Sequence, residues 1–429
     1  MVTKTNAVPG DLVEIELSKI IYQGTFLESP EDEKGLILLK LGTGYNIGLN
    51  KKDILGIKVL KKNIEGDKVV EGILNQKDKP NVAMIITGGT IAAKLNPKKG
   101  GVDWLTSTED LFKYYPELFE KVNVVKVEVP FMKASEDMDY KDWQKIAKIS
   151  EKLLNDPNIQ GLIITHGTDF LHYTSAALSF MLRDLNKPVV LTYSQRSIDR
   201  ASSDANLNLR CSALAAISDI AEVMLVGHAS QNDDFCNAMI GTKVRKMHSS
   251  RRDAFHTINL GPVAKISEDT IQPLLDHNVR NPKKKVKADV KFEEKVALVK
   301  FYPGQSPEIL DFYKKQKYKG IVLEMGALGH VATKRSRQGW TKKLEEIQKA
   351  GIVVCGVTQC LGGRTDPLVY SNGRELLGTG IIYLGDMLPE TSLVKLGWVL
   401  GHEEWSKDKK VVKEKMLHNF AREINERLG

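Results

Sequence analysis

The order of apolar and polar residues divides the chain into an N-terminal stretch with the pattern of strands and a longer stretch of alternating strands and helices. Over residues 13–17 and 45–49, apolar residues alternate with polar residues or glycine. A period of two is typical of strands that are buried on one face. No helical period appears in this stretch. We therefore predict a small all-β, barrel-like domain over residues 1–76.

From Asn81 onward the pattern changes. Short apolar runs have the length of strands, and segments such as 170–181 carry apolar residues at helical spacing. Alternating strands and helices of this size favour a parallel sheet covered on both faces. We predict such an α/β domain over residues 80–280. Its expected strands are residues 82–86, 161–164, 188–191 and 222–226.

A polar, basic stretch over residues 266–291 contains two prolines and is predicted to be a linker. A second α/β domain should then occupy residues 290–429. Its last helix is expected to carry one apolar stripe at i, i+4 spacing, formed by Val412, Met416, Phe420, Ile424 and Leu428. Its expected strands are residues 297–302, 320–324, 352–357 and 381–384.

Composition excludes several classes of protein. The 429 residues are 42% apolar and 27% charged, which is ordinary for a globular protein with two or three domains. No apolar run approaches the ~20 residues of a membrane span, and the first residues lack the apolar core of a signal peptide. We expect a cytoplasmic protein without a membrane segment.

The cysteines and the charge point to no particular ligand. Four cysteines are too few for a disulfide framework, and no histidine shows metal-ligand spacing, so no metal is expected. The net charge of +8 is compatible with nucleic-acid contact but does not require it. For the basic run Lys283–Lys287, a solvated linker is favoured over a tRNA-binding patch.

Two turns carry the chemistry of this chain. The segments Ile86–Ala92 and Ile164–Asp169 each follow an apolar run and place glycines and threonine hydroxyls where a strand ends. Ligands bind at the carboxyl ends of parallel strands, so the two turns could converge on one pocket. A threonine can act as a nucleophile when a base is near. A phosphate-binding turn is the competing interpretation, but neither GxGxxG nor GxxxxGK[ST] occurs.

These two turns, TGGTIA and HGTD, resemble the paired signatures of the L-asparaginase-like amidohydrolases. The resemblance runs from Asn81 to the C-terminus and includes a further match at Ala134–Met138. It implies an α/β fold: an asparaginase-like core of two α/β domains with a parallel sheet, here preceded by the small all-β domain. It also implies that the chain is an amidohydrolase rather than a binding protein with an inactive site.

The resemblance assigns catalytic roles to Thr90, Thr168, Asp169 and Lys246. Thr90 would attack the side-chain amide, and the other three would relay the proton. Which threonine attacks first comes from the resemblance alone. Lys246 matches the family position best, although Lys243 is close enough in sequence to compete.

The resemblance also assigns substrate binding to Ser135, Glu136 and Gly89. Asparaginases of this family carry a tyrosine in the loop after the first threonine, and residues 92–104 contain none. Tyr114 and Tyr115 come later, in a stretch that is predicted to be helical. We hypothesise that the loop is completed only when a partner and tRNA bind.

The segment Ser194–Asp204 and the extra N-terminal domain are similar to one branch of the family, the glutaminase subunits of archaeal glutamyl-tRNA(Gln) amidotransferases. This similarity implies that the chain hydrolyses L-glutamine and passes ammonia to the amidotransferase E subunit. That partner would use ATP and Mg²⁺ to act on Glu-tRNA(Gln), and this chain would hold no cofactor. A homodimeric core within a heterotetramer is also implied.

Two questions stay open in the sequence. A free-standing L-asparaginase is the alternative function, although such enzymes generally lack the N-terminal domain and the Ser194–Asp204 stretch. The N-terminal domain itself could contact tRNA or the E subunit, or could only pack against its own chain.

Overall fold

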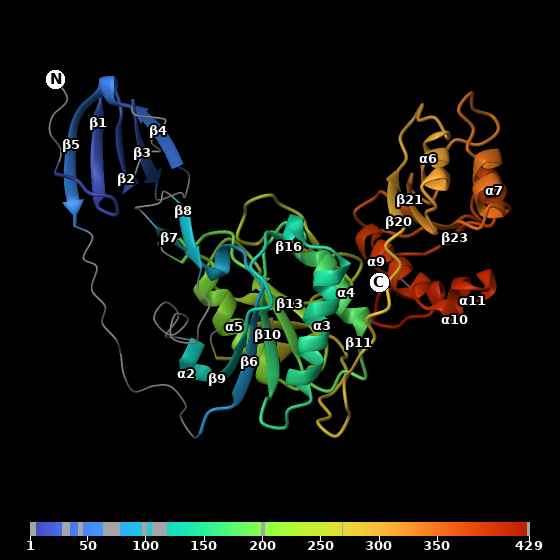
Figure 1. The fold of residues 1–429 in the computed structure, drawn as a ribbon, viewed down its shortest axis with the longest axis horizontal. Helices are drawn as coiled ribbons and strands as arrows, with labels where there is room; N and C mark the ends of the chain where they lie inside the picture. The colour runs from blue at the N-terminus through green and yellow to red at the C-terminus, as the bar shows by residue number, and fades with distance from the viewer. Residues whose placement is uncertain are drawn as a thin grey trace.

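The computed structural model describes the chain in segments, and Figure 1 shows three successive parts along it. No helix in these segments is long and apolar enough to cross a membrane. The described segments are residues 6–27, 35–41, 46–62, 78–96, 101–104, 118–198, 202–267 and 269–426.

The N-terminal part is an antiparallel sheet of five strands in the order β4-β3-β2-β1-β5. The residues predicted to face inward do so, because Val13, Ile15 and Leu49 are buried in one apolar cluster. The all-β prediction is therefore confirmed. The elements are β1 (Leu12–Leu17), β2 (Ile21–Leu27), β3 (Leu36–Leu41), β4 (Asn46–Asn50), η1 (Lys51–Asp53) and β5 (Ile54–Lys61).

The central part contains an eight-stranded sheet in the order β18-β17-β14-β13-β12-β10-β6-β9. Its strands β9, β6, β10, β12 and β13 are parallel, and the four strands predicted from the apolar runs are confirmed as β6, β10, β12 and β13. The strands are β6 (Asn81–Ile86), β9 (Asn123–Glu128), β10 (Gly161–Thr165), β12 (Val189–Thr192), β13 (Val223–His228), β14 (Cys236–Ile240), β17 (Ala264–Ile266) and β18 (Ile271–Pro273).

Helices cover both faces of this sheet, as the apolar runs predict. Ile85 packs in the cluster that contains α3 and α4, whereas the neighbouring Met84 packs in the cluster that contains α5. Successive strand residues thus face opposite layers. The helices are α2 (Leu118–Lys121), α3 (Tyr140–Leu154), α4 (Leu171–Met181) and α5 (Ala205–Ile217).

The predicted linker over residues 266–291 is wrong where short strands interrupt it. The strands β17 and β18 extend the central sheet, and β19 (Lys287–Ala288) pairs with β11 (Leu182–Arg183). Between them the carbonyl of Asn278 accepts a hydrogen bond from Ala221 N. These strands have two or three residues each, too few to show a period in a polar stretch.

The C-terminal part is built on a parallel four-stranded sheet in the order β20-β21-β22-β23, which confirms the second α/β unit. The strands are β20 (Val296–Lys300), β21 (Gly320–Met325), β22 (Val353–Thr358) and β23 (Ile382–Tyr383). The helices are α6 (Ile309–Lys315), α7 (Thr341–Lys349), α8 (Ser371–Leu377), α9 (Pro389–Leu400), α10 (Glu403–Ser406) and α11 (Lys409–Leu417).

The predicted terminal helix is wrong beyond Leu417, where α11 ends, and Leu428 lies outside the described residues. The buried ammonium of Lys395 donates hydrogen bonds to the carbonyls of Met416 and His418, at 2.9 and 2.6 Å. Those carbonyls are therefore satisfied without a further helical turn. Beyond the helix, the Glu423 carboxylate pairs with Lys395 at 2.5 Å and holds the chain in a different path.

The two α/β parts share a continuous apolar core. The helix α9 contributes Trp398 to the same cluster as Phe180 of α4, and their rings stack with centroids 5.8 Å apart. A buried ion pair adds to this contact, since Lys243 Nζ lies 2.6 Å from Asp386 Oδ2 and both side chains are fully buried. Asn425 also donates to both oxygens of Asp386.

We predict that Lys243→Met lowers the free energy of unfolding by about 3 kcal/mol or more, because it leaves the buried Asp386 carboxylate without its cation. Lys246→Met is the matched control: its partner Asp169 is 60% exposed, so the expected change is below about 1 kcal/mol. Urea denaturation of both variants measures the difference. Equal midpoints for the two variants would contradict a structural role for Lys243.

Candidate active site

The two glycine-containing turns meet at the carboxyl ends of neighbouring strands. In the register of β6 and β10, Ile86 lies opposite Thr165. The backbone N–H and the hydroxyl of Thr87 both donate to the Thr165 carbonyl, at 3.2 and 2.8 Å. A Cβ atom on Gly89 would lie 2.5 Å from Gly167 N, so a side chain there would separate the turns. Gly89 also has a φ of +84°, which disfavours other residues.

Lys246 joins the hydroxyl and the carboxylate of the second turn. Its Nζ donates to Thr168 Oγ1 at 2.8 Å and to Asp169 Oδ1 at 2.7 Å. The lysine comes from β15 (Val244–Lys246), far from the turn in sequence, and its side chain is only 9% exposed. The hydrogen bond from Lys246 holds the pKa of Asp169 below its ordinary value. This geometry favours Lys246 over Lys243, which is bound to Asp386.

Thr90 lies at the site because the preceding residue, Gly89, packs against Gly167 of the second turn. It is the first residue of η2 (Thr90–Ala92), and the buried side chains of Ile91 and Ala92 anchor this turn in the core. Thr90 itself is half-buried, and in the described part of the chain its hydroxyl makes no hydrogen bond. The hydroxyl is therefore available to a substrate.

The segment after Thr90 forms a hairpin of β7 (Ala93–Asn96) and β8 (Gly101–Trp104), paired antiparallel. This is the segment that lacks the family tyrosine. Tyr114 and Tyr115, and the helix expected around them, lie outside the described residues.

A third loop closes against the second turn. The buried hydroxyl of Ser135 accepts a hydrogen bond from Phe170 N at 3.2 Å and lies 3.3 Å from Glu136 Oε2. A Cβ atom on Gly167 would lie 3.1 Å from Ser135 N. Ser135 and Glu136, in η3 (Ser135–Asp137), thus lie beside the turn that carries Thr168.

His166 supports this turn from inside, a role that the sequence did not reveal. It is fully buried, with Nδ1 2.7 Å from the Gly167 carbonyl and Nε2 2.9 Å from Thr174 Oγ1. Because a carbonyl only accepts, Nδ1 carries the proton and the Thr174 hydroxyl donates to Nε2. Burial lowers the pKa of His166 to about 4, so the ring is neutral at pH 7. The motif HGTD contained this histidine, but nothing in it indicated a position beneath the turn.

A cavity of about 360 Å³ opens beside Lys246 and Asp169. Arg245 lines it and pairs with Glu390 of α9 at 3.0 Å, so both α/β parts contribute to its wall. His172 also lines the cavity, and burial lowers its pKa to about 3. Among the described residues, no three His, Cys, Asp or Glu side chains form a set of metal ligands.

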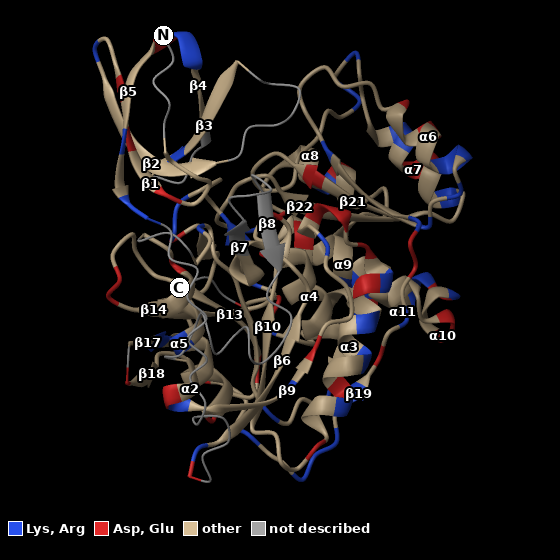
Figure 2. Cartoon of the chain, turned by 60° about the vertical axis from the view of Figure 1, so that its left-hand side comes forward, with Lys and Arg blue, Asp and Glu red and all other residues tan. Residues whose placement is uncertain are grey.

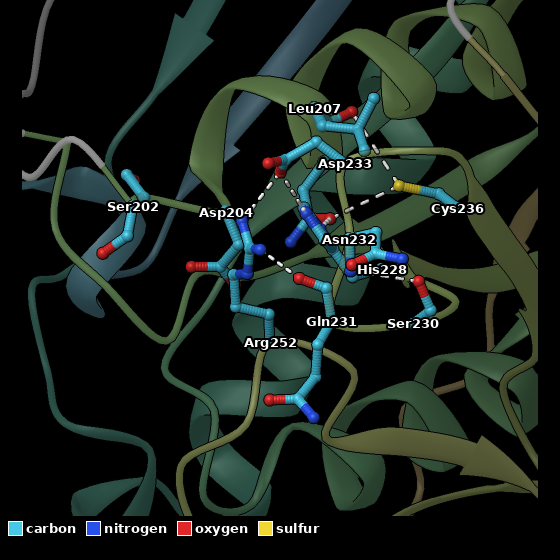
Figure 3. Close-up of polar contacts among 12 residues, drawn as sticks. Ser202, Asp204, Leu207, His228, Ser230, Gln231, Asn232, Asp233, Cys236 and Arg252 are labelled. Atoms are coloured by element: carbon cyan, nitrogen blue, oxygen red, sulfur yellow. Dashed lines mark hydrogen bonds and ion pairs between the residues drawn. The ribbon is translucent and has the colours of Figure 1, made fainter. Parts of the chain in front are cut away.

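The segment Ser194–Asp204 is held next to the central sheet rather than at Lys246. The buried Asp204 carboxylate accepts from the backbone N–H groups of Gln195 and Arg196. Figure 3 shows the neighbouring cluster, in which Asp233 lies 3.0 Å from His228 and 2.8 Å from Arg252. Among the described residues of this segment, none bonds to Thr168, Asp169 or Lys246.

Three family models match successive parts of the chain. "Asparaginase, N-terminal" matches residues 81–278, and "Glutaminase/Asparaginase C-terminal domain" matches residues 295–415. "GatD N-terminal domain" matches residues 7–60.

The fold is similar to that of solved L-asparaginases. The thermostable L-asparaginase from Thermococcus kodakarensis superimposes with a TM-score of 0.71 at 29% identity, covering 81% of this chain and 100% of that one. L-asparaginase I from Vibrio cholerae gives a TM-score of 0.66 at 27% identity, covering 81% and 99%.

Curated relatives match along almost the whole length. The D subunit of the glutamyl-tRNA(Gln) amidotransferase from Thermococcus kodakarensis is 45% identical over 423 residues, which cover 97% of this chain and 94% of that protein. The corresponding D subunit from Pyrococcus furiosus is 44% identical with the same coverage. The N-terminal sheet, the two α/β parts and these relatives together show that the chain belongs to the family of glutamyl-tRNA(Gln) amidotransferase D subunits.

Proposed function

We propose that this chain is a glutaminase that supplies ammonia for the conversion of Glu-tRNA(Gln) to Gln-tRNA(Gln) by the E subunit. The proposal rests on the contact of Lys246 with Thr168 and Asp169. Gly89 packs against the same turn and is followed directly by Thr90. A hydroxyl, a lysine and a carboxylate at one strand end are the groups that hydrolysis of an amide needs.

In the proposed reaction, the Thr90 oxygen attacks the carbonyl carbon of the glutamine side-chain amide. The Thr90 proton passes to the group formed by Thr168 and Lys246, whose nitrogen and oxygen lie 2.8 Å apart. That group returns a proton to the leaving nitrogen as the C–N bond breaks and ammonia departs. Water then hydrolyses the Thr90 ester and releases glutamate.

The amino-acid end of the substrate has two proposed anchors. Asp169 is 60% exposed and uses Oδ1 for Lys246 and Thr168. Among the described residues no partner occupies its Oδ2, which is therefore available to the α-ammonium. Ser135, together with Glu136 and Gly89, would bind the α-carboxylate through its hydroxyl and neighbouring N–H groups.

The proposed assembly places the other chemistry in the partner. The E subunit would bind ATP and Mg²⁺ and hold Glu-tRNA(Gln), and this chain would need no cofactor of its own. A homodimer of the asparaginase-like core within a heterotetramer, in the cytoplasm, completes the proposal. A free-standing L-asparaginase is the second candidate, because the solved structures that resemble this fold carry that name.

We predict that Thr90→Val lowers kcat/KM for glutamine hydrolysis about 10³-fold or more, because it removes the hydroxyl but keeps the branched shape. Thr90→Ser is the matched control and should retain activity. Ammonia release is measured with the chain alone and then with its E partner, ATP and Glu-tRNA(Gln). The proposal expects glutamine hydrolysis that rises with the partner. Strong asparagine hydrolysis at a rate that does not change when the partner is added would identify a free-standing asparaginase instead.

We predict that the neutral His166 makes the fold sensitive to acid. The unfolded chain protonates this histidine near pH 6.5, whereas the folded chain does so only near pH 4. Between these values the unfolded state binds more protons, so stability is lost as the pH falls from 6.5 to 4. The difference between the two pKa values corresponds to about 3 kcal/mol.

The variant His166→Gln tests this assignment, because its amide can still donate to Gly167 and accept from Thr174. Urea midpoints measured from pH 7 to pH 4 should fall less steeply for the variant than for the natural protein. Parallel curves would show that another group causes the acid loss.

A further inference from the structure

A second cavity lies at the opposite end of the central sheet from the active site. It has a volume of about 440 Å³ and lies beside β11 and the entry to β13, next to the C-terminal segment that follows α11. Charged side chains from four separate segments line it: Arg183, Asp184, Glu222, Lys284 and Arg422. Three of these five are cations.

Arg183 is a half-buried cation without a polar partner. In the described part of the chain its guanidinium forms no hydrogen bond and no ion pair. It lies instead over the rings of Phe420 and Trp398, 5.2 and 5.8 Å from their centroids. Burial lowers the pKa of Arg183 below its ordinary value. Cations inside proteins are normally paired with an anion, so this arrangement is incomplete.

The carboxylates nearest to Arg183 are engaged elsewhere. Asp289 lies 2.9 Å from His402, and Glu423 pairs with Lys395 at 2.5 Å. Both attract Arg183 at a distance without contacting it. Asp184 also attracts it but is exposed to solvent.

Arg422 is likewise incompletely paired. Among the described residues its buried Nη1 atom forms no hydrogen bond, and it makes only a long ion pair with Glu222, whose Oε1 is 3.5 Å away. That oxygen already accepts from the backbone and side-chain nitrogens of Asn278, each at 3.0 Å. The Nη1 group of Arg422 therefore has no hydrogen-bond acceptor among the described residues.

The backbone of the cavity wall is strained at two places. Arg422 has a φ of +64° and Asp184 has a φ of +54°, a region that residues other than glycine rarely adopt. Such conformations cluster at ligand sites, where the surrounding structure holds them. Thr242 fixes one of them by donating to the carbonyl of Ala421 at 2.8 Å.

We propose that this cavity binds the phosphate group of a phosphate ester, held by Arg183 and Arg422. Arginine is suited to phosphate because its planar donors match two phosphate oxygens. A cavity of about 440 Å³ has room for the organic part of such an ester. Lys284, from the basic run Lys283–Lys287, lies in the wall and adds a third positive charge. Figure 2 shows Lys and Arg (blue) as well as Asp and Glu (red) near β19, whose first residue, Lys287, ends this run.

The phosphate could belong to a free nucleotide or to the backbone of an RNA, and one titration series separates these sources. AMP and a short RNA duplex are titrated into the full chain by calorimetry, at fixed ionic strength in chloride buffer. We expect Arg183→Gln to weaken binding of the phosphate ligand about tenfold or more, because a charge-assisted pair of hydrogen bonds is lost. If the natural protein binds AMP and Arg183→Gln loses that binding, the cavity is a nucleotide site. If the natural protein binds the RNA but not AMP, and Arg183→Gln loses RNA binding, the cavity binds the RNA backbone.

The matched control is Lys283→Gln, which removes one charge from the same basic run but does not line the cavity. Its affinity should stay within about twofold of the natural protein, since diffuse charge contributes weakly at moderate salt. Arg422→Asn is the second variant, because asparagine tolerates a positive φ and preserves the fold. If Arg183→Gln and Arg422→Asn bind both ligands as tightly as Lys283→Gln does, the proposal is overturned. This inference does not depend on the proposed glutaminase activity.

Discussion

The site depends on a close backbone contact between two turns, which leaves no room for a side chain at Gly89. Gly89 approaches Gly167 so closely that a Cβ atom would lie 2.5 Å from a backbone nitrogen. The parallel register of β6 and β10 sets this distance, because it brings Ile86 opposite Thr165 and ends both strands at one edge. For this reason Thr90 lies next to the turn that contains Thr168 and Asp169, the partners of Lys246.

The strand that carries Lys246 follows directly after a lysine that joins the two α/β parts. The segment that ends in Lys246 begins with Lys243, whose buried ion pair with Asp386 ties it to the C-terminal part. Two lysines three residues apart thus have opposite environments. Lys243 is sealed between the two parts, and Lys246 faces a cavity. The same C-terminal part contributes Arg422 to the second cavity, at the other end of the sheet.

The sequence was sufficient where a pattern repeats over enough residues. The strands at 13–17 and 82–86 were predicted correctly, because the first alternates over five residues and the second is a continuous apolar run of strand length. The sequence was insufficient where tertiary contacts determine the secondary structure or the burial of a side chain. The strands of two or three residues near β18 carry no period, and Lys395 binds the carbonyls of Met416 and His418 at the point where α11 ends. The burial of His166 is of the same kind, since a single histidine in a motif does not reveal which way its ring points.

The most direct test of the account is to trap the nucleophile. In a glutamine analogue with a diazoketone in place of the side-chain amide, the hydroxyl proton passes to the diazo carbon, dinitrogen leaves, and the oxygen forms a stable bond to that carbon. Peptide mass spectrometry locates the adduct. We predict one adduct, on Thr90, formed far more slowly in Lys246→Ala. An adduct on Thr168, or labelling of Thr90 at the same rate without Lys246, would contradict the assigned roles.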